Sequence, residues 1–152
     1  MKLLFVCSSN FIRSPFAEHR LRAELRGEAV QVESAGSFAG ALPRALSRRV
    51  LDEAMLHGID LSTHRTKSTD PELLRSADLI LPMDEDSHWF VGEELREDAS
   101  AEKRIRRFVT FLGDVSLREI ADPLLDNEPY DESFALITRG VLEIHRWLTR
   151  QR

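Results

Sequence analysis

An uninterrupted apolar run near the start of the chain, followed at once by a polar loop, constrains the fold more than any other feature. Residues 3–6 contain no polar side chain, and such a run predicts a strand that is buried on both faces, as in a parallel sheet. After the loop, Ser14 and Pro15 offer a helix N-cap and a first helical position. The stretch therefore predicts strand, loop and helix, with the helix N-terminus facing into the loop.

The loop carries residue types that bind phosphate and attack it. Free N–H groups at a helix N-terminus favour anions, and the guanidinium of Arg13 is a fork-shaped donor that grips two phosphate oxygens at once. Cys7 opens the loop. A lone cysteine after a strand is usually a small buried hydrophobe, but these positive surroundings favour its thiolate form. Ser14 lies in the same loop, where its hydroxyl could donate a hydrogen bond to the sulfur of Cys7 and so stabilise the sulfur as a nucleophile.

The stretch from Cys7 to Pro15 resembles the phosphate loop of the low-molecular-weight protein tyrosine phosphatases. That loop typically reads C-x-G-N-x-C-R-S-P, and this chain reads C-S-S-N-F-I-R-S-P. Two positions depart from the pattern, because Ser9 stands where the family usually has glycine and Ile12 where it usually has a second cysteine. The resemblance implies that the loop residues bind the phosphate, namely Ser8, Ser9, Asn10, Phe11, Ile12, Arg13 and Ser14.

A second motif lies far along the chain, where Asp122 precedes Pro123. Asp-Pro pairs are by themselves common turn formers. In the family that the first motif resembles, a D-P loop carries the general acid that protonates the leaving phenolate, so the resemblance assigns that role to Asp122. The family often places aromatic residues directly after this pair, whereas this chain has two leucines. We expect the substrate slot to be walled by Phe11, Phe38, Leu124, Leu125 and Tyr130.

Two further segments resemble parts of the family that support the phosphate loop. Ser34 belongs to an S-A-G turn, whose serine in the family holds the loop asparagine, here Asn10. His64 ends a G-I-x-x-x-x-H segment, whose histidine hydrogen-bonds the same asparagine; the alternative is a solvated loop histidine. Asp84 matches an M-D strand end, where the aspartate is mainly a structural acceptor. The acidic run at residues 84–86 is not expected to bind metal, since no second cluster or histidine spacing accompanies it.

Elsewhere the chain alternates between strand and helix patterns. Residues 29–33 alternate apolar with polar side chains, as an edge strand does, and residues 79–83 and 108–112 predict two further strands. Because strands that alternate with helices pair in parallel, we expect an α/β fold. The resemblance adds a strand order of 2-1-3-4, which gives a four-stranded parallel sheet with helices on both faces. The last helix is predicted by a stripe of apolar residues at Phe134, Ile137, Val141, Ile144 and Leu148.

Composition limits the remaining possibilities. The 152 residues are 42% hydrophobic, which suits one core, so we expect a single domain over residues 1–152. A net charge of −5 argues against a nucleic-acid partner. The single cysteine excludes an internal disulfide, which suits the reducing cytoplasm. No apolar stretch approaches the roughly 18 residues that a membrane span requires.

The sequence therefore predicts a cysteine-dependent phosphatase that hydrolyses phosphotyrosine proteins or small aryl phosphates through a cysteinyl-phosphate intermediate and releases inorganic phosphate. The expected catalytic residues are Cys7, Arg13 and Asp122, and the mechanism requires no metal or other cofactor. Three alternatives fit the residues less well. Arsenate reductases share the fold and loop but need further cysteines. Protein-arginine phosphatases place threonine where this chain has Phe11, and a non-catalytic phosphate-binding module would be expected to lose one of the three catalytic residues.

Overall fold

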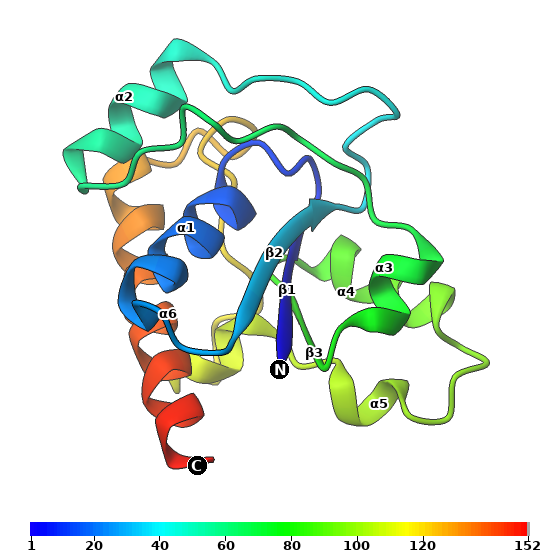
Figure 1. The fold of residues 1–152 in the computed structure, drawn as a ribbon. Helices are drawn as coiled ribbons and strands as arrows, with labels where there is room; N and C mark the ends of the chain where they lie inside the picture. The colour runs from blue at the N-terminus through cyan, green and yellow to red at the C-terminus, as the bar shows by residue number, and fades with distance from the viewer. Residues whose placement is uncertain (152) are drawn as a thin grey trace.

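A three-stranded parallel sheet forms the centre of the computed structural model, which describes residues 1–151 (Figure 1). The strands are β1 (Lys2–Cys7), β2 (Gln31–Gly36) and β3 (Leu79–Pro82), and their order is β2-β1-β3. The central strand pairs in parallel on both sides, with Leu4 opposite Glu33 of β2 and Ile80 of β3. The predicted order is correct for these three strands, and the alternating second strand lies at an edge of the sheet.

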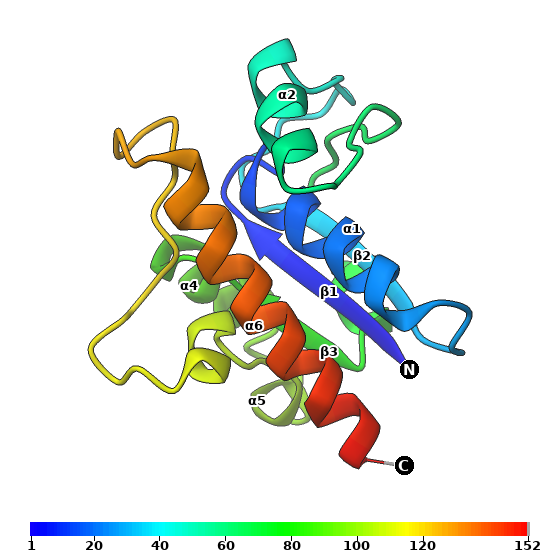
Figure 2. The ribbon, with the colours of Figure 1, turned by 90° about the vertical axis from the view of Figure 1, so that its left-hand side faces the viewer.

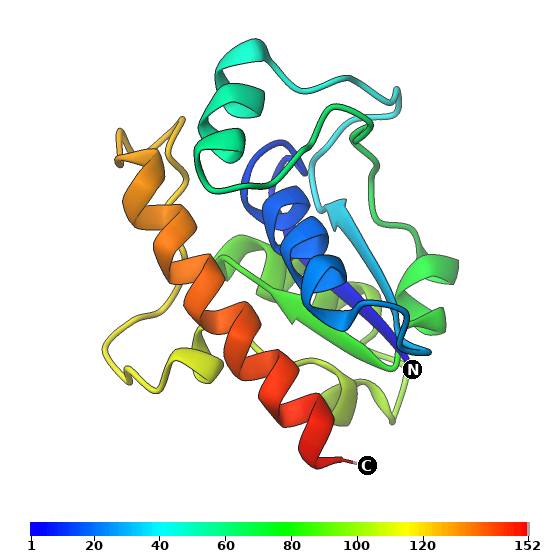
Figure 3. The same cartoon turned by 60° about the vertical axis from the view of Figure 1, so that its left-hand side comes forward.

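Helices cover both faces of this sheet, as predicted. The helical elements are α1 (Arg13–Leu25), α2 (Arg48–Leu56), α3 (Pro71–Ser76), α4 (Glu85–Glu94), α5 (Ala101–Arg104), the 3-10 helix η1 (Phe108–Leu112) and α6 (Tyr130–Arg150). Figure 2 shows α1 and α6 side by side in front of the sheet, and Figure 3 shows α3 and α4 beyond it. Within residues 1–151, none of the helices has the length and apolar character needed to cross a membrane.

The apolar run in β1 is explained by the two cores that it separates. Successive side chains of a strand point to opposite faces. Leu3 and Phe5 point into the larger core, which includes buried residues of α1, α2 and α6. Leu4 and Val6 point into the smaller core, formed with residues of α3, α4 and α5. All four are fully buried, and each such side chain stabilises the fold by about 1.5–3 kcal/mol.

The predicted fourth strand at residues 108–112 is wrong, because these residues form η1. Phe108 and Phe111 are both buried in the larger core. Side chains three residues apart lie on the same side of a 3-10 helix, whereas in a strand they would point to opposite faces. Beyond β3 the sheet continues with one isolated parallel bridge, between Ile80 and Ile105. Packing of both aromatic rings into one core therefore decides the structure of this segment.

The predicted start of the first helix is also corrected. Helix α1 begins at Arg13, and Ile12 occupies the N-cap position without a side-chain hydrogen bond to the helix. Ser14 and Pro15 therefore lie inside the first turn, where a missing proline N–H costs nothing because the first N–H groups have no partner within the helix. Since Ser14 does not cap the helix, its hydroxyl is available to Cys7.

Candidate active site

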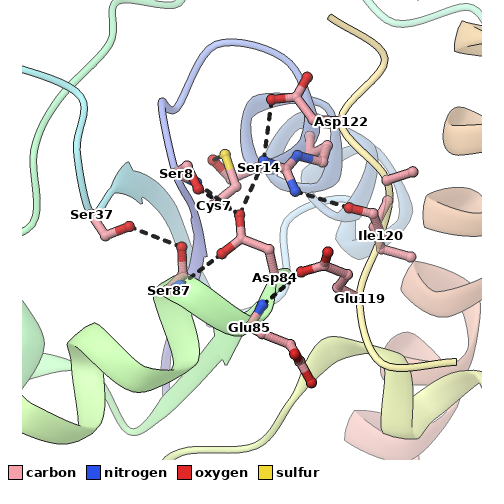
Figure 4. Close-up of polar contacts among 12 residues, drawn as sticks. Cys7, Ser8, Ser14, Ser37, Asp84, Glu85, Ser87, Glu119, Ile120 and Asp122 are labelled. Carbon is pink, nitrogen blue, oxygen red and sulfur yellow. Dashed lines mark hydrogen bonds and ion pairs between the residues drawn. The ribbon is translucent and has the colours of Figure 1, made fainter. Parts of the chain in front are cut away.

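The loop that joins β1 to α1 places Cys7 beside Ser14. Cys7 ends β1 and is almost fully buried, and its Sγ lies 2.9 Å from the Oγ of Ser14 (Figure 4). Asn10 adopts a φ of 55°, a left-handed conformation that asparagine tolerates better than most residues. Ser9 does not share this conformation, so its replacement of the family's glycine requires no positive φ. A glycine is needed at Gly36, where β2 approaches the loop so closely that a Cβ would lie 2.8 Å from the carbonyl oxygen of Ser8.

Four neighbours hold the side chain of Asn10, and their bonds determine its orientation. The backbone N–H of Lys67 donates to Oδ1 at 3.0 Å, which identifies that atom as the oxygen. The Nδ2 group therefore donates to the hydroxyls of Ser14 and Ser34, each at 2.9 Å. His64 Nε2 lies 3.1 Å from Oδ1 and must donate to it. The contacts predicted for Ser34 and His64 with Asn10 are thus both present.

The direction of these bonds has a consequence for the nucleophile. Because the Oγ of Ser14 accepts from Asn10, its own proton is free to point at the sulfur of Cys7. A hydrogen bond donated to a charged group stabilises the charged form. The buried network therefore presents a hydrogen-bond donor to the sulfur of Cys7.

Two buried titratable side chains, His64 and Glu18, support this network. Burial and the nearby His19 lower the pKa of His64 to about 4, so the ring that donates to the loop is neutral at pH 7. Ser34 donates to the carboxylate of Glu18. Burial of Glu18 raises its pKa above the ordinary value. Glu18 was not among the predicted site residues, and no local motif around it indicates this contact.

Arg13 is buried, and three acceptors hold its guanidinium. Its Nη1 donates to the carbonyl oxygen of Ile120 at 2.9 Å. Its Nη2 lies 3.0 Å from Oδ2 of Asp84 and 3.4 Å from Oδ2 of Asp122. The structure therefore brings together all three residues that the sequence assigned to catalysis. Cys7 and Arg13 lie at the two ends of one loop, and Asp122 of the D-P segment contacts Arg13.

Asp84 accepts hydrogen bonds as the sequence predicts, but its ion pair with Arg13 was not predicted. Its Oδ2 accepts hydrogen bonds from the backbone N and the Oγ of Ser8, at 3.1 and 2.8 Å. Its Oδ1 accepts from the N of Ser87 at 2.7 Å and caps helix α4. The signal for this ion pair was the position of Asp84 two residues beyond the end of β3, because functional sites of open α/β sheets form beyond the carboxyl ends of the strands.

The predicted slot residues differ in exposure. Phe11 and Tyr130 are half-buried and pack against the larger core. The relative exposures of the others are 61% for Phe38, 63% for Leu124 and 76% for Leu125. The backbone N of Phe38 donates to the carbonyl of Ser8 at 2.7 Å, and the N of Leu124 donates to Oδ1 of Asp122 at 3.0 Å. In Figure 4, Ser37 and Asp122, the neighbours of Phe38 and Pro123 in the sequence, are drawn on opposite sides of Cys7.

Comparison with known proteins agrees with this geometry. The family model for low molecular weight phosphotyrosine protein phosphatase matches residues 2–152. A relative from Ralstonia nicotianae, the probable low molecular weight protein-tyrosine-phosphatase EpsP, is 34% identical over 154 residues, which span 99% of this chain and 95% of the relative. The protein-arginine-phosphatase of Bacillus subtilis is 39% identical over 85 residues, 55% of each chain. A crystal structure of YfkJ from Bacillus subtilis shares the fold, with a TM-score of 0.88 at 21% identity over 100% of this chain and 96% of that one.

The chain therefore belongs to the low molecular weight phosphotyrosine protein phosphatase family. Members of this class are hydrolases that depend on a cysteine nucleophile, and the chain is such an enzyme.

Proposed function

We propose that Cys7, Arg13 and Asp122 carry out the hydrolysis of phosphotyrosine in a protein substrate or of a small aryl phosphate. The observation that supports this most directly is the contact of 2.9 Å between Cys7 Sγ and the Ser14 hydroxyl, in a loop that also holds the buried Arg13. The single cysteine is consistent with activity in the reducing cytoplasm.

In the first step, the thiolate of Cys7 attacks phosphorus in line with the aryl oxygen, so that an S–P bond forms while the P–O bond breaks. The loop N–H groups and Arg13 hold the three equatorial oxygens, which is the largest stabilising contribution in such sites. A bound phosphate competes with Asp122 for the Nη2 of Arg13, 3.4 Å away, which releases the carboxyl group. In its protonated form Asp122 gives its proton to the leaving oxygen, a contribution of about 10²- to 10⁴-fold.

In the second step, water attacks the cysteinyl phosphate and the S–P bond breaks. Asp122, now a carboxylate, takes the proton of the water, and inorganic phosphate leaves. The Ser14 hydroxyl stabilises the departing thiolate by the hydrogen bond already present in the structure. One carboxyl group therefore acts first as acid and then as base.

The test compares two aryl phosphates, one with an acidic phenol such as 4-nitrophenol and one with phenol itself as leaving group. We expect Asp122→Asn to slow the phenol ester by about 10²-fold or more and the 4-nitrophenyl ester far less, because only the first leaving group needs the proton. Equal slowing of both esters would remove Asp122 from the acid role.

Cys7→Ser is the companion variant. It should abolish turnover of both esters, because the nucleophile is lost, while inorganic phosphate still binds to Arg13 and the loop donors. Turnover that persists without the thiol would overturn the assignment of the nucleophile.

A further inference from the structure

We propose that Glu18, His19 and His64 form a binding site for a divalent transition metal ion of the zinc type, separate from the reaction centre. Glu18 and His19 lie in α1, and His64 lies in the segment between α2 and α3. Each offers one ligand atom, and these atoms all lie within 4.8 Å of one another. Ligands around a tetrahedral zinc ion are about 3.4 Å apart, so side-chain shifts on the order of an ångström would close the site.

The tautomer of His64 suits this role. Its Nε2 must donate to Oδ1 of Asn10, because the backbone N–H of Lys67 identifies that atom as the oxygen. The lone pair of the ring is therefore on Nδ1, the atom that faces Glu18. Metal-binding histidines usually donate their other ring N–H to a carbonyl or carboxylate oxygen, which orients the ring. Asn10 already provides that second contact.

Glu18 offers one carboxylate oxygen to the same point. Its Oε1 pairs with Arg22 at 2.8 Å. Its Oε2 accepts from Ser34 and lies 3.9 Å from Nδ1 of His64. A carboxylate oxygen has two lone pairs in its plane, so Oε2 can accept from Ser34 and bind a cation at the same time. The negative charge also favours a cation at this position.

His19 completes the donor set and connects it to solvent. Its ring meets that of His64 edge to face, with 5.8 Å between the ring centroids. Glu18 and His64 are buried, whereas His19 is half-buried, so an ion can enter past His19 and keep a water molecule as its fourth ligand. Two imidazole nitrogens and one carboxylate oxygen are typical of zinc sites and unlike the all-oxygen sites of magnesium and calcium.

The ion would connect α1 to the segment that supports the phosphate loop. His64 is one of the groups that hold Asn10, and Glu18 holds Ser34, which also contacts Asn10. A metal ion bound by both Glu18 and His64 would hold these two side chains in fixed positions. We therefore expect the ion to stabilise the folded protein without entering the reaction.

The first test measures zinc binding by competition with a chromogenic chelator. The full chain without an affinity tag is used in the Cys7→Ser background, which removes the thiolate as a competing ligand. We expect one equivalent of Zn²⁺ to bind, and affinity to fall at least tenfold when His19→Ala or His19→Gln is added. His145→Ala is the matched control, because His145 is a half-buried histidine on α6 that lies outside the cluster. Its addition should leave the affinity unchanged.

The second test measures thermal unfolding of the same variants with and without Zn²⁺. A ligand that binds the folded state raises the melting temperature, so at one fixed zinc concentration the rise should be large in Cys7→Ser and in the His145→Ala control and smaller in the His19 variants. The proposal is overturned if no equivalent of zinc binds, if affinity does not depend on His19, or if the melting temperature rises equally in the His19 variants.

Discussion

The Nη2 of Arg13 lies 3.0 Å from Oδ2 of Asp84, and both side chains are buried. The same oxygen accepts two hydrogen bonds from Ser8, at the start of the phosphate loop. One carboxylate from the end of β3 therefore compensates the buried charge of the arginine and holds the loop that follows β1. Removing one partner of a buried pair is costly because the remaining charge is left uncompensated.

Asp84→Asn tests this relationship. The amide has a single acceptor oxygen, so it can serve either Ser8 or the cap of α4 but not both, and it loses the charge that faces Arg13. We expect the free energy of unfolding to fall by up to about 3 kcal/mol, less than for a fully unpaired charge because Asp122 still contacts Arg13. Urea unfolding measures the change. Asp86→Asn, an exposed acid in the first turn of α4, is the control, and equal effects of both variants would contradict the prediction.

Phe11→Thr tests which phosphorylated side chain the slot prefers. Phe11 is the half-buried predicted slot residue directly after Asn10, at the position where the alternative considered from the sequence, a protein-arginine phosphatase, would have threonine. We expect the ratio of phosphotyrosine to phosphoarginine turnover to fall about tenfold, because the smaller polar residue gives up apolar contact with the ring. Phe38→Thr changes an exposed phenylalanine and serves as the comparison. An unchanged ratio in Phe11→Thr would show that other residues wall the slot.

Asp126 positions the segment that carries the proposed acid. Its Oδ2 accepts from the N of Asp122 at 2.7 Å, and its own N donates to the carbonyl of Asp122 at 2.8 Å. We expect Asp126→Ala to lower kcat for phenyl phosphate several-fold, because the acid is less precisely held. Asp126→Asn keeps an acceptor oxygen and should retain most of the rate. If Asn lowers the rate as much as Ala, the charge of Asp126 matters and the hydrogen bond does not.

Gly140 allows α6 to approach η1. A Cβ at this position would lie 2.3 Å from the ring of Phe108, which is fully buried. We expect Gly140→Ala to lower the free energy of unfolding by about 1–3 kcal/mol, as overpacking does. A Cβ at Gly92 in α4 would have no neighbour within 4 Å, so Gly92→Ala should stabilise the protein by about 0.5–1 kcal/mol. Thermal unfolding of both variants checks the prediction, and a Gly140→Ala protein as stable as the parent would contradict it.

Several features were predictable from the sequence because their causes are local. The stretch from Cys7 to Pro15 is contiguous, so its residue types alone indicated a strand, a phosphate loop and a helix. The apolar run in β1 indicates a strand buried on both faces, and the alternation of apolar and polar side chains at residues 29–33 indicates a strand with one exposed face. The central and edge positions of these two strands could therefore be predicted. The family resemblance supplied the contacts of Ser34 and His64 with Asn10.

Other features were decided only by the tertiary structure. Residues 108–112 are apolar enough for a strand, but packing Phe108 and Phe111 into one core requires a helical turn. Ser14 has the residue type of an N-cap, yet its hydroxyl contacts Cys7 because Asn10 orients it. Asp84 and Arg13 are far apart in the chain and meet because β1 and β3 are neighbours in the sheet. The sequence by itself determined the chemistry of the loop, and the packing of distant segments decided which charges and hydrogen bonds surround it, because contacts between distant residues leave no local pattern.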